Sequence, residues 1–272
     1  MASFICPVCS GELNNKSSYY TCSSNHCYDI SKSGYINLLM SQKTQNHGDD
    51  KLMVRARRDF LEKGYYNKMR QALADTVNYY CKSGDTVIDA GCGECFYTSY
   101  IYDILNSYGK DTTFLAIDIS KNALAYAKNR NNGILRAVAS IFHIPVADRS
   151  CDILLNVFAP YCENEFQRVI KKDGIYIQVI PLKDHLWSLK KAVYDVPYKN
   201  ITDEYRLNGF ELVKSREIKG KITLNSNDDI KNLFMMTPYY YKTSSSDYKK
   251  LDNYNSLTVE TEFAILVYKR AG

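Results

Sequence analysis

The residues best suited to chemistry form a glycine-containing loop, Asp89-Ala90-Gly91-Cys92-Gly93-Glu94, directly after the apolar pair Val87-Ile88. Glycines where a strand meets a helix let the backbone turn tightly and approach a ligand closely. The acidic residues at the two ends of the loop disfavour the pyrophosphate of a dinucleotide and favour a cationic sulfonium amino acid. The loop therefore predicts an S-adenosylmethionine site at Asp89, Gly91, Gly93 and Glu94, although Gly-x-Gly also occurs in plain strand-to-helix turns.

A further carboxylate, Asp118, follows the apolar run 114–117, which predicts a second strand of the same sheet. Ligands of open α/β sheets bind beyond the carboxyl ends of the strands, so Asp118 is placed to accept hydrogen bonds from ribose hydroxyls. Alternatively, it caps the helix predicted over 121–129. The Gly-x-Gly-x-x-Gly spacing of nicotinamide oxidoreductases is missing, and Cys95 stands where many related loops carry a third glycine.

A second set of ligating residues lies near the N-terminus, in the spacing Cys6-x2-Cys9-x12-Cys22-x3-His26. This spacing is typical of a structural zinc site, whose four ligands leave no open position for catalysis. The polar segment 1–38 has too few apolar residues for a core of its own, so metal binding would stabilise its fold. Cys27 leaves an alternative open, because Cys22-x4-Cys27 could complete a site of four cysteines.

Composition and charge fit a soluble intracellular protein. No apolar run of the 272 residues is long enough to span a bilayer, and residues 1–40 lack the apolar core of a signal peptide. The nine cysteines are therefore expected to be reduced thiols in the cytoplasm. The net charge of +5 is matched by the stretch 51–70 alone, which holds seven basic residues and two acidic ones. Such a patch suits phosphate contacts through Arg55, Arg57 and Arg58, or is simply a solvated helix face.

The elements that must position these residues alternate along the chain. Two helices are expected between residue 51 and Ser83-Gly84-Asp85, the second carrying Met69, Leu73 and Val77 on one face. Short apolar strands separated by helices then predict a mainly parallel sheet covered on both faces. The expected strands are 86–90, 113–117, 135–139, 153–158, 175–180, 219–224 and 258–268, and the expected helices are 96–105, 121–129, 163–170, 185–194 and 228–236.

The predicted fold class is therefore α/β, with a seven-stranded Rossmann-like sheet of the class I methyltransferase type and a small N-terminal zinc-binding module. We expect three parts: a zinc-finger RNA-recognition module over 1–38, a linker and basic helical lead-in over 39–82, and the methyltransferase domain over 83–272. The linker composition is clearest at 41–50. The last strand alternates apolar and polar residues, which favours an antiparallel strand on the edge side of the sheet.

Together these features resemble the bacterial 23S rRNA (guanine-N1)-methyltransferase family of the RlmA type, along nearly the whole chain. Besides the zinc ligands and the loop 89–94, the resemblance covers Gly34-Tyr35-Ile36-Asn37-Leu38-Leu39, Ala56-Arg57-Arg58-Asp59-Phe60-Leu61, Gly64-Tyr65-Tyr66, Phe96-Tyr97-Thr98, Ala159-Pro160, Arg168-Val169-Ile170-Lys171 and Met236-Thr237-Pro238. The sequence departs from the family at Cys95, at Tyr161-Cys162 and at Ile141-Phe142 ahead of His143, so local details of the pocket are open.

The resemblance implies methyl transfer from S-adenosylmethionine to N1 of a guanine in the helix 35 hairpin of 23S rRNA, and allows for a homodimer. It implies cofactor contacts at Tyr66, Gly93-Glu94 and His185, and zinc ligands at Cys6, Cys9, Cys22 and His26. It does not identify the guanine within the hairpin, and an effect on macrolide sensitivity is suggested by the family and not by these residues.

The group that accepts the guanine N1 proton is not fixed by the sequence. Carboxylates and imidazoles are the usual acceptors, which makes Glu163, His185 and Asp29 candidates. The backbone at Ala159-Pro160 offers carbonyl acceptors, unless it is only a strand-ending turn. Two other functions remain open: a methyltransferase acting on a small molecule or protein, and a zinc-containing RNA-binding protein with a vestigial cofactor site.

Overall fold

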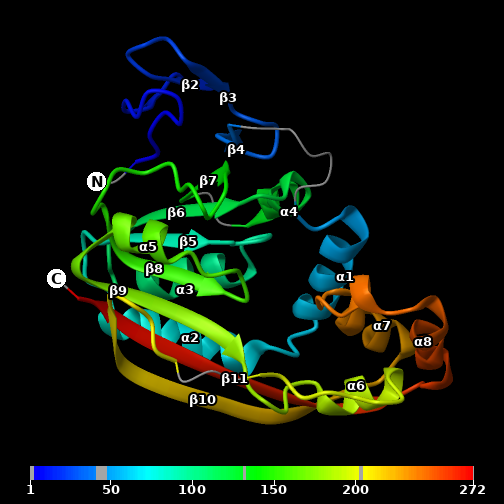
Figure 1. Cartoon of the computed structure of the whole chain (residues 1–272). Coiled ribbons are helices and arrows are strands. Elements are labelled where there is room, and N and C mark those ends of the chain that lie inside the picture. The colour runs from blue at the N-terminus through cyan, green and yellow to red at the C-terminus, as the bar shows by residue number, and fades with distance from the viewer. Residues whose placement is uncertain (1–2, 41–47, 131–132, 202–204, 272) are drawn as a thin grey trace.

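One sheet of eight strands organises the computed structural model, which describes residues 3–40, 48–130, 133–201 and 205–271 (Figure 1). The strand order is β10-β11-β9-β8-β5-β6-β7-β4, parallel from β9 to β4, with β11 antiparallel to β9 and β10. The bounds are β4 Tyr35–Asn37, β5 Thr86–Ala90, β6 Thr113–Asp118, β7 Ile134–Val138, β8 Cys151–Val157, β9 Ile170–Pro181, β10 Phe210–Leu224 and β11 Leu257–Arg270. The predicted α/β class is confirmed, and β4 extends the expected seven strands to eight.

Both faces of this sheet are covered because its central strands are apolar on both sides. Val87 of β5 packs in one apolar cluster and its neighbour Ile88 in another, as alternating side chains of a strand must. The first face is covered by α2, α3 and α4, the second by α5 and the N-terminal segment. The helices are α1 Lys51–Glu62, α2 Asn67–Tyr80, α3 Phe96–Ser107, α4 Lys121–Tyr126, α5 Glu163–Val169, α6 Trp187–Val193, α7 Asn227–Met235 and α8 Ser245–Lys249, with short 3-10 turns η1 Ala127–Asn129, η2 Tyr240–Lys242 and η3 Lys250–Asn253.

The N-terminal segment forms a three-stranded antiparallel sheet of β1 Asn14–Asn15, β2 Tyr19–Thr21 and β3 Cys27–Asp29. It then supplies β4, which pairs in parallel with β7 at the top edge of the large sheet in Figure 1. The segment therefore shares a sheet with the rest of the chain. A strand of three residues carries no period that a sequence pattern can reveal, which is why β4 was not expected.

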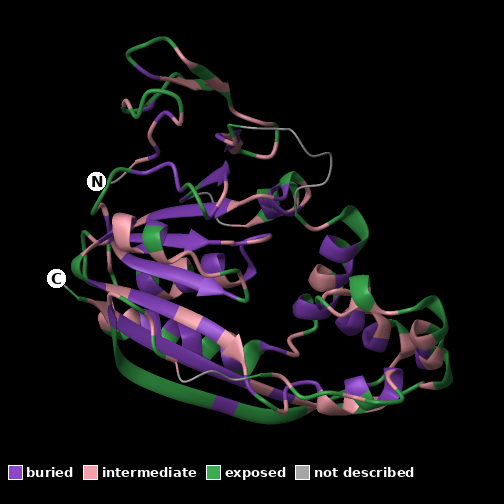
Figure 2. Cartoon of the chain, in the orientation of Figure 1, coloured by how far each residue is buried: buried purple, intermediate pink, exposed green. Residues whose placement is uncertain are grey.

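The antiparallel edge differs most from expectation. Strand β10 begins at Phe210 rather than at residue 219, and it is the edge strand, exposed along most of its length in Figure 2. Strand β11 is not at the edge: β9 and β10 flank it, and its residues from Phe263 to Tyr268 are buried. The helix expected over 185–194 begins at Trp187.

Of the predicted linker, residues 41–47 lie outside the described residues. Asp50 caps α1, because its carboxylate accepts a hydrogen bond of 2.8 Å from the amide of Met53. No described helix has the length and apolarity that a membrane span requires.

Candidate active site and metal centre

The loop after β5 turns where the sequence predicts. Gly91 has a φ of +91°, and a Cβ added to it would lie 2.5 Å from the Cβ of Ala159, so only glycine fits. The amides of Gly91 and Cys92 both donate to the carbonyl of Ile117 at 2.9 Å. The loop is thus tied to the end of β6 and lies against the loop after β8.

Asp118 holds the same loop from the end of β6. Its Oδ2 accepts from the amide of Gly93 at 2.8 Å and its Oδ1 from the amide of Ser120 at 2.7 Å. Ser120, not Asp118, caps α4, through a hydrogen bond from the amide of Ala123. The capping alternative for Asp118 is therefore excluded. Burial raises the pKa of Asp118, and the two backbone donors oppose that rise.

Glu94 is buried between two arginines. Its Oε1 lies 3.1 Å from the guanidinium of Arg130 and its Oε2 lies 3.7 Å from that of Arg58. Burial raises the pKa of Glu94, and the two guanidinium groups oppose that rise. The sequence suggested that the negative charge of Glu94 faces the sulfonium of the cofactor. That charge is already balanced by the two arginines of the protein.

Asp89 is also buried, and only one of its oxygens has a partner. Oδ2 accepts from the hydroxyl of Thr98 at 2.5 Å, while Oδ1 has no partner among the described residues. Burial raises the pKa of Asp89 to about 7, and the neighbouring Asp118 adds to that rise. The sequence argument from two acidic loop ends therefore needs correction, because Asp89 is not a full negative charge near neutral pH. Its free Oδ1 instead offers a polar contact to a ligand.

A cavity of about 660 Å³ opens beside this loop, at the carboxyl ends of the parallel strands. That volume lies within the usual range of roughly 300–1,000 Å³ for small-molecule and cofactor sites. The cavity brings together all seven residues for which the sequence suggested a cofactor contact: Tyr66, Asp89, Gly91, Gly93, Glu94, Asp118 and His185. A wall of apolar and aromatic side chains completes it opposite the loop. The shape, the free carboxylate oxygen and the glycine turn fit an amino-acid nucleoside.

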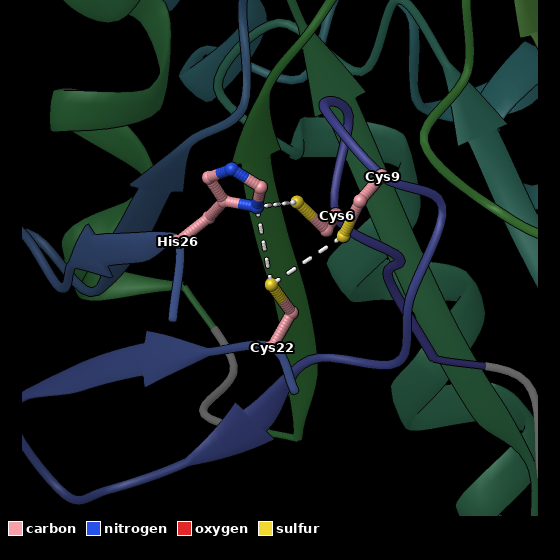
Figure 3. Close-up of side chains that lie close together, drawn as sticks. All are labelled: Cys6, Cys9, Cys22 and His26. Carbon is pink, nitrogen blue, oxygen red and sulfur yellow. Dashed lines mark hydrogen bonds between the residues drawn. The ribbon is translucent and has the colours of Figure 1, made fainter. Parts of the chain in front are cut away.

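The second centre lies in the N-terminal segment, where the ligand atoms of Cys6, Cys9, Cys22 and His26 all lie within 4.8 Å of one another (Figure 3). Nδ1 of His26 is 3.5 Å from Sγ of Cys6 and 3.3 Å from Sγ of Cys22. Thiolate ligands on a tetrahedral zinc ion stand about 3.8 Å apart, given Zn–S bonds of about 2.3 Å. The four side chains therefore fit a closed zinc site.

Details around this cluster favour the same ligand set. The thiol of Cys27 points elsewhere and donates to Oγ1 of Thr21 and to the carbonyl of Asn25. The hydrogen bond from the Gly11 backbone, followed by that of the His26 side chain, lowers the pKa of Cys9 to about 6, whereas burial raises the pKa of Cys22. The two shifts differ in direction, so the ligand set follows from the positions of the four side chains.

Comparison with known proteins agrees with both centres. A family model described as "RlmA, N-terminal" matches residues 4–46, and one described as "Methyltransferase domain" matches residues 81–235. A protein of Micromonospora griseorubida is 32% identical to this chain, over 68% of this chain and 67% of that protein. The name of that protein gives 23S rRNA (guanine-N(1)-)-methyltransferase as a predicted activity. The chain belongs to this methyltransferase family.

Two further relatives carry names for the same activity. The Bacillus subtilis protein YxjB, whose name gives it as a predicted activity, is 27% identical over 97% of this chain and 96% of its own. The 23S rRNA (guanine(748)-N(1))-methyltransferase of Streptomyces fradiae is 31% identical over 69% of this chain and 66% of its own. The solved YcgJ protein of B. subtilis shares the fold, with a TM-score of 0.50 at 14% identity over 76% of this chain and all of its own. S-adenosylmethionine is the methyltransferase's cofactor, and zinc is its structural metal.

His185 of the methyltransferase is held neutral in the cavity wall. Its Nδ1 accepts from the amide of Glu262 at 3.1 Å, which leaves the proton on Nε2. Burial, and to a lesser extent the charge of Lys190, lowers the pKa of His185 to about 3. The imidazole packs 4.6 Å from the ring of Phe263. In this state His185 can donate a hydrogen bond to a ligand, and it is poorly suited to accept a proton.

The other three catalytic candidates of the methyltransferase are placed differently. Pro160 lines the cavity, and its carbonyl accepts from Nδ2 of Asn156 at 2.8 Å. Glu163 is outside the described cavity lining, and its carboxylate accepts from Nδ2 of Asn208 at 2.9 Å. Asp29, at the end of β3, is exposed and also outside that lining.

The three arginines expected to contact RNA differ in exposure and in their ion-pair partners. The side chain of Arg55 is 72% exposed, and Asp59 lies 3.6 Å from it. Arg57 lines the cavity and forms an ion pair with Asp49, while Arg58 pairs with Glu94. Only Arg55 is therefore free to meet a phosphate without first breaking a contact to the cofactor-binding region.

Several cavity residues were not expected from the sequence. Asp49, Phe142 and Phe158 line the cavity from loops, and Tyr241 lines it from η2, all from segments far apart along the chain. Arg130, which neutralises Glu94, follows η1 and belongs to no motif. The only signal for Phe142 was the departure from the family at Ile141-Phe142.

Proposed function

We propose that this methyltransferase transfers a methyl group from S-adenosylmethionine to N1 of a guanine in the helix 35 hairpin of 23S rRNA. The observation that carries the proposal is that the loop after β7 lines the cofactor cavity at Ile141 and Phe142 and contacts the zinc module at Pro145 and Val146. Phe4 forms a β-bridge with Val146, and the amide of Ile5 donates to the carbonyl of Pro145 at 2.9 Å. The zinc module, which is suited to bind RNA, thus lies next to the cavity in which a base would react. The names of the relatives support 23S rRNA as the substrate and N1 of a guanine as the target atom.

The chemistry asks little of the protein beyond alignment, because the sulfonium of the cofactor supplies an already activated methyl group. The protein's own residues must orient the base while the N1 proton leaves to solvent water. The Pro160 carbonyl, held by Asn156, has a second lone pair with which to accept a hydrogen bond from N1–H. His185, protonated on Nε2, donates to the cofactor or to the base edge.

The assignment of residues is part of the proposal. Tyr66, Asp89, Gly91, Gly93, Glu94, Asp118 and His185 form the cofactor site. The part over 1–38 recognises RNA, 39–82 links it and adds basic charge, and 83–272 carries out the transfer in the cytoplasm. Sedimentation equilibrium tests the homodimer that the family resemblance allows.

The test is incubation of the enzyme and labelled S-adenosylmethionine with undermethylated 23S rRNA, followed by primer extension across the RNA. Methylation at N1 blocks base pairing, so arrest of the primer one nucleotide before a guanine reports both the position and the atom. Arrest outside helix 35 would reject the hairpin, and label without arrest would reject N1. Calorimetric titration with S-adenosylmethionine separates an enzyme from an RNA-binding protein with a vestigial site. Label on a small molecule or protein, with none on RNA, would favour that other substrate class.

A further inference from the structure

Phe142 is an exposed ring at the cofactor cavity. Its side chain lines the cavity, yet the residue is 61% exposed. Isolated exposed apolar side chains are common, so exposure alone carries no conclusion. The hydrogen bonds that hold the backbone at Phe142, and its position between the zinc module and the cavity, do indicate a role.

The turn that presents Phe142 is well braced. The carbonyl of Ser140 accepts from the amide of His143 at 3.0 Å, and the hydroxyl of Ser140 accepts from the amide of Phe142 at 3.2 Å. Ile141, on one side of Phe142, is buried. The ring is therefore held outward by a hydrogen-bonded turn rather than left on a loose loop.

Helix α5 fixes the turn from its other side. The carboxylate of Glu165 accepts from the amide of Ile144 at 2.5 Å, and the guanidinium of Arg168 donates to the carbonyl of Ile144 at 2.7 Å. Glu165 and Arg168 are themselves paired at 2.7 Å. Both backbone groups of Ile144 are thereby anchored, only two residues beyond Phe142.

The same turn connects the zinc module to the cavity. Ile141 and Ile144 belong to one apolar cluster with the zinc ligands Cys6 and Cys22. The β-bridge of Phe4 to Val146 continues this contact along the loop. A nucleic acid held by the zinc module would therefore meet the Phe142 turn on its way into the cavity.

Strand order places a second exposed ring across from this one. Phe142 follows β7 and Phe158 follows β8, and these strands flank β5 and β6, which carry the cofactor loop and Asp118. Phe158 is 44% exposed, and its φ of +59° is strained for a bulky residue, a feature that concentrates at functional sites. Its ring is fixed against Phe263 at 5.6 Å. Two aromatic rings thus stand on either side of the cofactor-binding strands.

We propose that Phe142 is a positioning residue that stacks on a nucleobase next to the target base, and so holds the RNA loop open at the cavity. Unpaired bases are commonly bound on aromatic side chains, since every base has a face to stack. The inference rests on the proposed function and adds to it a specific contact with single-stranded RNA. Stacking on a base needs a planar ring, whereas packing needs only an apolar side chain. Substitutions that keep an apolar side chain but remove the ring therefore distinguish the two roles.

The test compares Phe142→Ala, Phe142→Leu and Phe142→Trp in the full-length, zinc-loaded enzyme. Each is assayed for the KM of an rRNA transcript, for kcat and for the affinity for S-adenosylmethionine. We expect Phe142→Ala and Phe142→Leu to raise the KM for RNA about tenfold, within the range reported for the loss of one base–aromatic stack. Phe142→Trp should restore it. The affinity for S-adenosylmethionine is measured because Phe142 also lines the cavity, and a loss of cofactor affinity as large as the rise in the KM for RNA would overturn the inference by showing that the ring acts on the cofactor. Tyr108→Ala is the matched control, since Tyr108 is an exposed ring outside the described cavity lining.

A transcript with 2-aminopurine beside the mapped guanine gives a second readout. Its fluorescence should be quenched on binding to the wild type and to Phe142→Trp, and not on binding to Phe142→Leu. A Phe142→Leu enzyme with the wild-type KM and quenching would overturn the inference while leaving the proposed function intact. A wild-type enzyme that binds the cofactor but transfers no methyl group to the RNA would reject the proposed function, and the inference with it.

Discussion

The carboxylate of Asp118 accepts a hydrogen bond of 2.8 Å from the backbone amide of Gly93, and this bond joins the end of β6 to the loop after β5. A second bond, from the amide of Ser120, occupies the other carboxylate oxygen. The residue that the sequence assigned to the ribose thus also shapes the loop that surrounds the cofactor.

Asp118→Ala is therefore expected to weaken S-adenosylmethionine binding by more than about tenfold, since hydrogen bonds to a charged group contribute about 1.5–3 kcal/mol each. Titration calorimetry measures the dissociation constant. Glu211→Ala, which removes an exposed carboxylate of β10, should leave it unchanged. Unaltered cofactor affinity in Asp118→Ala would refute the ribose assignment.

Arg130 and Arg58 contribute unequally to the charge balance of Glu94. Arg130 is the closer and the less exposed, at 3.1 Å and 15%, against 3.7 Å and 28% for Arg58. Removing Arg130 leaves Glu94 with Arg58 alone and also removes the 2.6 Å ion pair of Arg130 with Glu62, whereas removing Arg58 leaves the closer partner of Glu94 in place. We expect Arg130→Ala to lower the urea midpoint of unfolding more than Arg58→Ala does. Equal midpoints for the two variants would show that Arg130 is not the main partner of Glu94.

The sequence predicts the buried parallel strands and the cofactor loop, but not the features that depend on contacts between distant segments. The apolar run of β5 was placed at its observed bounds, because a strand buried on both faces has a continuous apolar pattern. Strand β10 was shortened because most of its residues are exposed and charged, and only pairing with β11 makes it a strand. The cofactor loop was visible as a motif. Arg130 and Phe142 were not, because the fold alone brings them to the cavity.

Asp89 gives the stability of the enzyme a defined pH dependence. Its native pKa is raised from 3.8 to about 7, chiefly by burial, so between these values the native state binds more protons than the unfolded chain. The contribution of Asp89 to the free energy of unfolding therefore falls as pH rises from about 4 to 7. Asp89→Asn removes the titrating group and keeps an oxygen for the Thr98 hydroxyl.

The free energy of unfolding of Asp89→Asn, minus that of the wild type, should consequently increase between about pH 5 and pH 8. Urea titrations at the two pH values measure it. Other titrating groups, His185 included, are present in both proteins and cancel in the difference. A difference that is independent of pH would mean that Asp89 titrates as an ordinary carboxyl group.

The zinc ligand set can be tested with two neighbouring thiols. Cys22 lies in the cluster with Cys6, Cys9 and His26, whereas Cys27 donates its hydrogen bonds elsewhere. We expect Cys22→Ser to lose the bound zinc, measured by atomic emission, and to lower the melting temperature. Cys27→Ser should retain one equivalent of metal. Loss of zinc in Cys27→Ser but not in His26→Ala would instead establish a site of four cysteines.

Arg55 and Arg58 should differ in their effects on RNA binding, although they are close neighbours on α1. Arg55 is 72% exposed, and the Asp59 ion pair beside it is weak because water screens both groups. Neutralising one phosphate-binding cation lowers the slope of log affinity against log salt by about 0.7–0.9. We expect that reduction in Arg55→Ala, measured by filter binding of an rRNA transcript at several salt concentrations. The affinity of Arg55→Ala for S-adenosylmethionine should be unchanged. Arg58→Ala should weaken cofactor binding instead, because Arg58 pairs with Glu94 in the cavity wall. A salt slope in Arg55→Ala equal to that of the wild type would exclude a phosphate contact at Arg55 and leave the start of α1 as an ordinary solvated face.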